Sequence, residues 1–432
     1  MVDKQNLPKM SVTAAPIVPG LAMQSKAAPP MAGAACQPDP MRPGAFVIPQ
    51  SHWAMSPHSR WTYSHVRELT RTASIWRGPG PVLPLPQRLT DIDRIEFATS
   101  SDGRSTIRGF LDRDCTDGFL VLHRGHIVAE KYMNGMEPHM QHTGMSVSKS
   151  VTGTVFGILV HKGLIDPGRL ATDYLPELEA TAYRGAKVQH LLDMAAGVKV
   201  TMGWYTPNTD EYTFYAAAGF WPGDGNPDDP INTWQAILRL TDQEAPHGAR
   251  WKYRDPENDV LGFIMQRVTG RRLPELYSSE LWRPMGAEED AYLIVDQSGQ
   301  ANADGGFNAT LRDYARFALL HLRDGNLNGK QIISPKWIEE TRSPNSYLFK
   351  IFGTERRHLP NGAYHNTFWI EDAERRAYWA IGSGGQTIYI DPEADFAAVK
   401  LSHWPEPSNQ TEDFWFDAMA AIRAIRDAFA GR

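Results

Sequence analysis

The segment from residue 146 to residue 164 limits the possible folds more than any other part of this chain. Val, Ile, Leu and Phe occupy several faces of a helix drawn through it, with small residues such as Gly153, Thr154 and Gly157 between them. A helix that is apolar on all sides is stable only when other elements cover it. The sequence therefore predicts a helix buried in the interior of the folded chain.

Strands are predicted on both sides of this helix along the chain. Residues 118–123 and 126–132 are apolar runs separated by a short glycine turn, which is typical of a β-hairpin. Towards the other end, short apolar runs separated by Gly or Asp-Pro turns cover residues 377–382, 387–390 and 396–401. This order predicts an α+β fold, with an antiparallel sheet built from both ends of the chain, flanked by helices, and an inserted mainly helical domain.

Three regions follow from the same patterns. Residues 1–45 are rich in Ala, Pro, Met and Gly without a helical or strand period, which indicates a flexible N-terminal arm. Residues 46–164 and 301–432 are expected to form the α/β sheet domain, and residues 165–300 the helical domain. Aromatic residues interleaved with Gly and Pro between 204 and 221 suggest a lid over a site. An aromatic cluster packed under a long loop is an equally good interpretation.

Composition excludes several classes of protein. The 432 residues carry a net charge of -6, which argues against a dedicated nucleic-acid binder. No apolar run approaches the roughly 20 residues of a membrane span. The only cysteines, Cys36 and Cys115, cannot form a disulfide scaffold or a cysteine-rich metal site. The first residues do not resemble a secretory signal, so a cytoplasmic location is expected, with no metal and no cofactor.

The chemistry is indicated by a serine followed by a lysine three residues later, at the start of the buried helix. Residues at this spacing share one helix face, so the amine of Lys149 can reach the hydroxyl of Ser146. Serine is a weak nucleophile unless a base takes its proton. Burial can lower the pKa of a lysine far enough for it to serve as that base. Taken alone, a helix-capping serine and a solvated lysine are the more common explanation of such a pair.

Two later segments could complete such a site. Tyr253 could hold a phenolate or pass a proton to the leaving group, although a packed aromatic side chain is the simpler explanation of a lone tyrosine. The segment 382–386 is rich in glycine, which lets a backbone approach a substrate closely. A backbone N–H of this segment and that of Ser146 could form an oxyanion hole, and a plain β-turn would explain the glycines as well.

In this order the three elements resemble the serine β-lactamase and penicillin-binding-protein superfamily. Within it the chain is most similar to 6-aminohexanoate-dimer hydrolases, and next to class C β-lactamase-like carboxylesterases. The likeness implies a β-lactamase/DD-peptidase-like fold, no cofactor, a small-molecule amide or ester substrate and a possible homodimer. It assigns catalysis to Ser146, Lys149 and Tyr253, the oxyanion hole to Ser146 and Gln386, and substrate contacts to Asp255, Ser383, Gly384 and Gly385.

The chain departs from the pattern of that superfamily at three points. Asp255 stands where an Asn or Ser is usual, and it could pair with Lys149, hold it protonated and shift the role of base to Tyr253. The third motif has no lysine, which lowers the odds of penicillin recognition. A substrate-contacting tyrosine of the dimer hydrolases corresponds here to Trp204 or Tyr205, and the alignment is ambiguous between them.

The sequence thus predicts a serine hydrolase that cleaves short linear amides, such as the 6-aminohexanoate dimer, through an acyl-enzyme on Ser146. A carboxylesterase without useful amidase activity is the nearest alternative. A D-amino-acid peptidase or β-lactamase, and a non-catalytic penicillin-binding-like protein, stay open as well.

Overall fold

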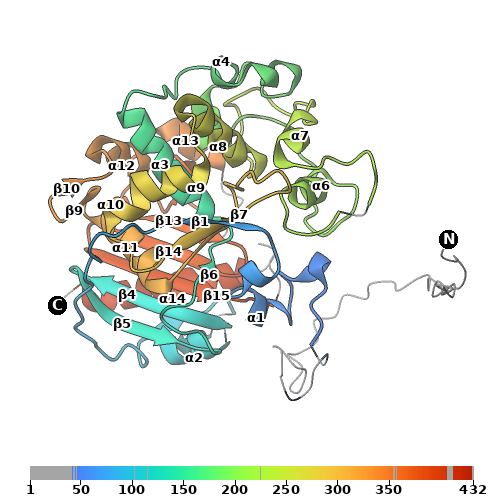
Figure 1. Ribbon diagram of the computed structural model, residues 1–432. Helices are drawn as coiled ribbons and strands as arrows, with labels where there is room; N and C mark the ends of the chain where they lie inside the picture. Colours follow the sequence, from blue (N-terminus) through green and yellow to red (C-terminus); the bar gives the residue numbers. More distant parts are fainter. Residues whose placement is uncertain are drawn as a thin grey trace, which may run out of the picture. The chain divides into compact units, whose positions relative to one another are not determined.

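The computed structural model describes residues 41, 44, 46–101, 103–113, 115–223, 225–353, 356, 358–405 and 412–430. The predicted N-terminal arm lies almost entirely outside these residues. These described residues belong to one compact unit (Figure 1), and the two domain boundaries predicted inside it stay predictions.

A seven-stranded antiparallel sheet forms the centre of the fold, which confirms the predicted α+β class. Its order is β11-β12-β13-β14-β15-β4-β5, so that the predicted hairpin joins the C-terminal strands by pairing β4 with β15. The strands are β4 (Thr116–His123), β5 (His126–Tyr132), β11 (Ala363–His365), β12 (Phe368–Ile370), β13 (Tyr378–Gly382), β14 (Gln386–Asp391) and β15 (Phe396–Ser402).

Helices cover both faces of this sheet, as Figure 1 shows, and each face has its own apolar core. Leu120 and Leu122 of β4 point to one face and join the core that contains α3 (Val147–His161) and α11 (Leu311–Leu322). Phe119 and Val121 point to the other and join the core formed with α2 (Ile107–Arg113) and α14 (Glu412–Phe429). Because successive side chains of a strand alternate between faces, a continuous apolar run is what a doubly covered strand requires.

Helix α3 is the buried helix that the sequence predicts. Every residue from 147 to 159 is buried, including the polar ones. Its small residues mark close approaches of other elements. A Cβ atom at Gly153 would overlap Thr367, and one at Gly157 would overlap the indole of Trp337. These glycines therefore let α12 (Pro335–Arg342) and the β11–β12 turn pack directly on the helix backbone.

A second, four-stranded sheet was not predicted. It has the order β1-β7-β8-β6, with β1 (Thr72–Ile75), β6 (His142–Thr143), β7 (Ala291–Ile294) and β8 (Phe307–Ala309). Strand β6 ends just before α3 begins, and the Gly144 N–H donates a hydrogen bond to the Phe307 carbonyl. This sheet therefore fixes the backbone that leads into the predicted nucleophile.

The region from 165 to 300 is mainly helical but also contributes strand β7. Its helices are α4 (Ala171–Tyr174), a 3-10 helix (Pro176–Ala180), α5 (Val188–Leu192), α6 (Asp210–Ala217), α7 (Thr233–Leu238), α8 (Pro256–Thr269), α9 (Leu273–Leu276), a π-helix (Tyr277–Trp282) and α10 (Arg283–Met285). Elsewhere the described chain contains α1 (Ser59–Thr62), α13 (Ser346–Phe352) and two small hairpins, β2–β3 (Glu96–Ala98, Arg104–Thr106) and β9–β10 (Asn326–Leu327, Lys330–Gln331). Within the described ranges, none of the helices combines the length and apolar character that crossing a bilayer requires.

Candidate active site

The hydroxyl of Ser146 is available for chemistry, although the residue occupies the N-cap position of α3. Its side chain makes no capping hydrogen bond. Instead Ser146 Oγ accepts a hydrogen bond from Lys149 Nζ at 2.9 Å. The preceding residue, Met145, has a φ of 45°, a left-handed conformation that is unusual for a residue with a side chain. The turn thus presents the serine to the interior while α3 begins behind it.

Lys149 is buried among oxygen atoms. Besides Ser146 Oγ, its Nζ donates to the Asp304 carbonyl at 3.0 Å and lies 3.3 Å from the Asp304 carboxylate. Asp255 Oδ1 is 2.7 Å away, so the pairing predicted for this departure from the family pattern is present. Burial alone would lower the pKa of Lys149, but Asp255, Tyr253 and Asp304 outweigh it and raise the pKa well above its usual value. Lys149 therefore keeps its proton at neutral pH.

Tyr253 lies beside this pair. Its ring centroid is 5.0 Å from Lys149 Nζ, and the side chains of Lys149 and Ser146 both favour ionisation of its hydroxyl. The ring stacks on Trp369 at 5.5 Å, which fixes its orientation. Burial raises the pKa of Tyr253 to about 12, against the opposing effect of Lys149. The structure thus brings together the three side chains to which the sequence assigns catalysis.

Two carboxyl groups of the site were missed by the sequence analysis. Asp304 accepts hydrogen bonds from Lys149 and, at 2.7 Å, from the Tyr215 hydroxyl. Glu211 accepts from the Gly203 N–H at 2.6 Å, and burial, with Asp255 nearby, raises its pKa to about 7. The sequence does offer one indication that Asp304 belongs to a site, because this charged residue stands directly before the glycine pair 305–306. Glu211 sits in an aromatic-rich loop and carried no comparable signal.

A cavity of about 500 Å³ opens in front of Ser146. Trp204, Tyr215 and Trp369 form aromatic parts of its wall. Asp255 and Glu211 add two acidic groups to the wall, and Arg356 adds a basic one. The guanidinium of Arg356 packs 5.1 Å from the ring centroids of both Trp251 and Trp369. The cavity therefore combines apolar surface with charges of opposite sign beside the serine.

The aromatic segment 204–221 is a packed cluster. Trp204 contacts Tyr215 and Trp221, with ring centroids 5.5 and 5.8 Å apart. Trp204 lines the cavity, whereas Tyr205 stacks on His52 at 5.7 Å and is not part of the cavity wall. Of the two residues between which the alignment is ambiguous, Trp204 is the one placed to meet a substrate. Whether the cluster also moves as a lid stays a prediction.

The glycine-rich segment 382–386 lies against the nucleophile, but Gln386 is not its point of contact. Gly382, at the end of β13, approaches the Gly144 carbonyl and the Ser146 N–H so closely that a Cβ atom would overlap them. Ser383, the next residue, lines the cavity. Gln386 begins the neighbouring strand β14, outside the cavity wall, and its amide is bonded to the Ser402 backbone at 2.7 and 3.0 Å. Ser383 therefore replaces Gln386 as the candidate for the second oxyanion donor.

Gly384 and Gly385 shape this turn from behind the cavity. Their φ angles are 76° and 90°, a region that favours glycine. A Cβ atom at Gly384 would overlap the ring of Tyr63, and one at Gly385 would overlap the ring of Trp404. Neither glycine belongs to the cavity wall, so their placement does not favour the predicted contact with the substrate.

No group of three His, Cys, Asp or Glu side chains among the described residues is arranged to hold a metal ion. The residues brought together are instead those of acyl transfer: a nucleophile, a cation beside it, a phenol, and backbone N–H groups at a turn.

Comparison with known proteins points in the same direction. The family described as Beta-lactamase matches residues 105–422. The 6-aminohexanoate-dimer hydrolase of Paenarthrobacter ureafaciens is 34% identical over 364 residues, which is 83% of this chain and 88% of that protein. A solved structure from Bacillus anthracis, provisionally named 6-aminohexanoate-dimer hydrolase, has a TM-score of 0.80 and 30% identity, covering 88% of this chain and 97% of its own. A family VIII carboxylesterase is similar in fold, with a TM-score of 0.53 and 17% identity over 74% of this chain and 96% of that chain.

Proposed function

The chain belongs to the beta-lactamase family of serine hydrolases, and from that premise we propose that it cleaves short linear amides through an acyl-enzyme on Ser146. The observation that supports this most is the 2.9 Å contact between Ser146 Oγ and the buried Lys149 amine inside a cavity of substrate size. A structural serine or a solvated lysine would need neither the burial nor the contact.

In the proposed reaction, Ser146 Oγ attacks the substrate carbonyl and the C–N bond of the amide breaks. Because Asp255 and Asp304 keep Lys149 protonated, Tyr253 receives the serine proton as a phenolate, which the Lys149 ammonium stabilises. Tyr253 then gives that proton to the leaving amine. A water molecule, deprotonated by the same tyrosine, hydrolyses the ester on Ser146 and restores the enzyme.

The backbone N–H groups of Ser146 and Ser383 are the proposed oxyanion hole. Both residues line the cavity, and Gly382 brings their two segments into direct contact. The start of α3 adds the positive end of a helix dipole at the same place. One donor of this kind is typically worth about 100- to 1,000-fold in rate.

The residues of the cavity wall favour a linear substrate that is charged at both ends. Glu211 can receive an ammonium group and Arg356 a carboxylate, while the aromatic wall accommodates the methylene chain between them. A dimer of 6-aminohexanoate has this chemistry, and the curated relative from Paenarthrobacter ureafaciens is named for its hydrolysis.

Intact-mass spectrometry tests the acyl-enzyme directly. After brief exposure to activated esters and to 6-aminohexanoate amides, the wild-type protein should gain the mass of one acyl group, and peptide mapping should place it on Ser146. Ser146→Ala should gain none. An adduct that maps to another residue, or the same adduct on the variant, would contradict the proposal.

Replacing Asp255 by asparagine should raise activity at neutral pH. Asp255 is a negative group near Tyr253 and raises the pKa of its phenol, so its removal should increase the phenolate fraction. Each unit by which this pKa falls gives about tenfold more phenolate. We expect kcat/KM at pH 7 to rise about three- to tenfold, and the ascending part of the pH–rate profile to move to lower pH.

Asp296→Asn is the control for this variant, because Asp296 is also buried but caps α7 through the Thr233 N–H, at 3.0 Å. Its pH–rate profile should match that of wild type. If Asp255→Asn folds with a normal melting temperature and loses more than about tenfold in kcat/KM, the phenolate mechanism is wrong.

Replacing Glu211 by glutamine should weaken binding of substrates that carry an ammonium end. We expect KM for the 6-aminohexanoate dimer to rise about tenfold, the equivalent of roughly 1.4 kcal/mol, with kcat little changed. Because the pKa of Glu211 is raised to about 7, the wild-type KM should itself increase as the pH falls below 7 and the carboxylate is protonated. Neutral p-nitrophenyl acetate is the internal control, since its KM should stay within twofold in the variant.

Ester hydrolysis is the second candidate activity, because the same groups act on any acyl carbonyl and an alkoxide leaves more readily than an amine. Side-by-side kinetics on p-nitrophenyl acetate and the 6-aminohexanoate dimer separate a carboxylesterase from an amidase. Stable labelling by a fluorescent penicillin would favour a D-amino-acid peptidase or β-lactamase instead.

A further inference from the structure

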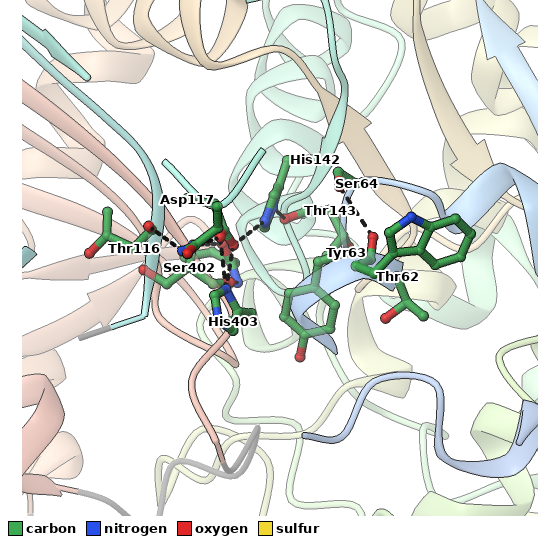
Figure 2. Close-up of polar contacts among 12 residues, drawn as sticks. Thr62, Tyr63, Ser64, Thr116, Asp117, His142, Thr143, Ser402 and His403 are labelled. Atoms are coloured by element: carbon green, nitrogen blue, oxygen red, sulfur yellow. Dashed lines mark hydrogen bonds and ion pairs between the residues drawn. The ribbon is translucent and has the colours of Figure 1, made fainter. Parts of the chain in front are cut away.

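A second cluster of titratable groups lies apart from the catalytic residues. Figure 2 shows Asp117 between two histidines from distant parts of the chain. Its carboxylate lies 2.8 Å from His403 Nδ1 and 3.1 Å from His142 Nε2. Asn134 donates a further hydrogen bond to it at 3.0 Å. All three titratable side chains are buried, so water contributes little to holding them together.

One branch of this cluster leads to the nucleophile. His142 belongs to β6, and its Nδ1 lies 3.0 Å from the Thr143 carbonyl. The Thr143 N–H binds the Tyr63 carbonyl at 2.8 Å, and the next residue, Gly144, is bonded to β8. Ser146 follows two residues later. The contact between Asp117 and His142 therefore anchors the short backbone segment that sets the position of the Ser146 N–H.

The other branch leads to the glycine turn. His403 follows β15 and precedes Trp404, whose N–H donates to the Gly384 carbonyl at 3.1 Å. The ring of Trp404 packs against Gly385, and the ring of Tyr63 packs against Gly384. Tyr63 also meets His142 edge-on, with ring centroids 5.8 Å apart. The turn that carries Ser383 is thus held by groups that the same carboxylate holds.

We propose that Asp117 is a positioning residue for this hydrolase, which, through His142 and His403, holds the two backbone segments that carry the Ser146 and Ser383 N–H groups in register with each other. The inference rests on the proposed function in one respect, the assignment of these two groups as oxyanion donors. It concerns residues that contact neither the substrate nor the reacting atoms.

The charge on His403 makes its contact with Asp117 sensitive to pH. Burial lowers the pKa of His403, but the Asp117 carboxylate outweighs burial and raises that pKa from 6.5 to about 9. Tyr63, His142 and Cys115 are the other titratable groups that face this pair. Because folding raises the proton affinity of His403, its stabilising effect is complete below about pH 6.5 and is lost as the pH rises through about 9.

The experiment compares wild type with His403→Asn, in which the amide can still donate from the position of Nδ1 but carries no charge. The contribution of His403 to kcat should be lost as the pH passes about 9, its pKa, so the ratio of wild-type to variant kcat should fall there, whereas the rise in kcat from ionisation of Tyr253, with a pKa of about 12, is common to both proteins. In His403→Asn, kcat at pH 7.5 should be about tenfold lower than in wild type with KM within twofold, and the kcat values of the two proteins should converge above pH 9. Asp117→Asn should behave in the same way if it folds.

Asp391→Asn is the matched control, since Asp391 is a buried carboxylate at the opposite end of β14, bonded to Arg375 at 2.6 Å. It should lose stability, but its kcat should stay close to that of wild type on both sides of pH 9. If His403→Asn and wild type have the same pH profile, or if the kcat values at pH 7.5 are equal, the inference is wrong.

Hydrogen exchange separates this failure from a failure of the proposed function. After correction for intrinsic rates, exchange in residues 142–146 and 383–386 should increase in wild type as the pH passes 9, and should be fast at all pH values in His403→Asn. This readout needs no activity. If Ser146 forms no acyl adduct but exchange behaves as described, the proposed reaction fails while the coupling of the two segments stands. Exchange that shows no such change overturns the coupling itself.

Discussion

Replacing Ser146 by alanine should lower kcat/KM for ester and amide substrates by at least about 1,000-fold, with the melting temperature nearly unchanged. Loss of the nucleophile in a serine hydrolase leaves only the contribution of the oxyanion hole and of substrate binding. The side chain of Ser146 makes no capping hydrogen bond, so the substitution costs the helix little. Steady-state kinetics together with thermal unfolding measure the two effects.

Ser150→Ala is the matched control, because it is the same substitution one helical turn later in α3. The Ser150 hydroxyl is buried and donates to the Thr367 carbonyl at 2.8 Å, away from the cavity. Its removal should cost roughly 1 kcal/mol of unfolding free energy and leave kcat within about twofold. If Ser146→Ala keeps wild-type activity, the serine is not the nucleophile and the proposed reaction falls with it.

Replacing Lys149 by alanine should damage both activity and stability. The variant loses the cation beside the nucleophile, and we expect kcat to fall about 1,000-fold. In the wild-type protein, Lys149 Nζ lies 2.7 Å from the Asp255 carboxylate and 3.3 Å from that of Asp304. The variant leaves both buried carboxylates without this countercharge. Removing one partner of a buried ion pair typically costs about 3–5 kcal/mol.

The stability loss in Lys149→Ala should depend on pH in a particular direction. Burial raises the pKa of Asp255, and removal of the lysine takes away the largest effect that opposes that rise, leaving the hydrogen bond with Tyr215. The folded variant then binds more protons than the unfolded chain, so its stability should increase as the pH falls from 7 towards 5. Urea unfolding at several pH values measures this. Lys199→Ala, which breaks an exposed pair with Asp242 at 3.2 Å, should cost less than about 1 kcal/mol at every pH. A loss of similar size in both variants would contradict the argument.

The parts of the fold that could be predicted are those with a local signal. The hairpin β4–β5 and the strands β13 to β15 show apolar runs between turn residues, and α3 is apolar on every side. The four-stranded sheet has no such signal. Its strands are two to four residues long, and β1 pairs with β7 across more than half of the chain, with Thr72 opposite Ile294. Pairing over that separation depends on the assembled core, which local periodicity does not encode.

The residues of the site likewise fall into those that could be predicted from local sequence and those that could not. Ser146 and Lys149 could be predicted because helix geometry relates residues three apart. Asp304 reaches Lys149 from 155 residues away, and no pattern in the sequence connects them. The choice between Gln386 and Ser383 depends on a finer feature. The two residues flank a tight turn between β13 and β14, and only the three-dimensional path of that turn decides which one faces the cavity.

The pairing of β4 with β15 has a consequence for how the protein is made. Strand β4 emerges from the ribosome long before β15, the strand with which it pairs. Phe119 of β4, for example, lies opposite Lys400 of β15, which is translated much later. Until then the hairpin presents a bare apolar edge, the kind of edge that recruits other chains into aggregates. Recombinant yield should therefore respond to slower translation, lower temperature or chaperone supply, and fragments that stop before residue 396 should accumulate as inclusion bodies.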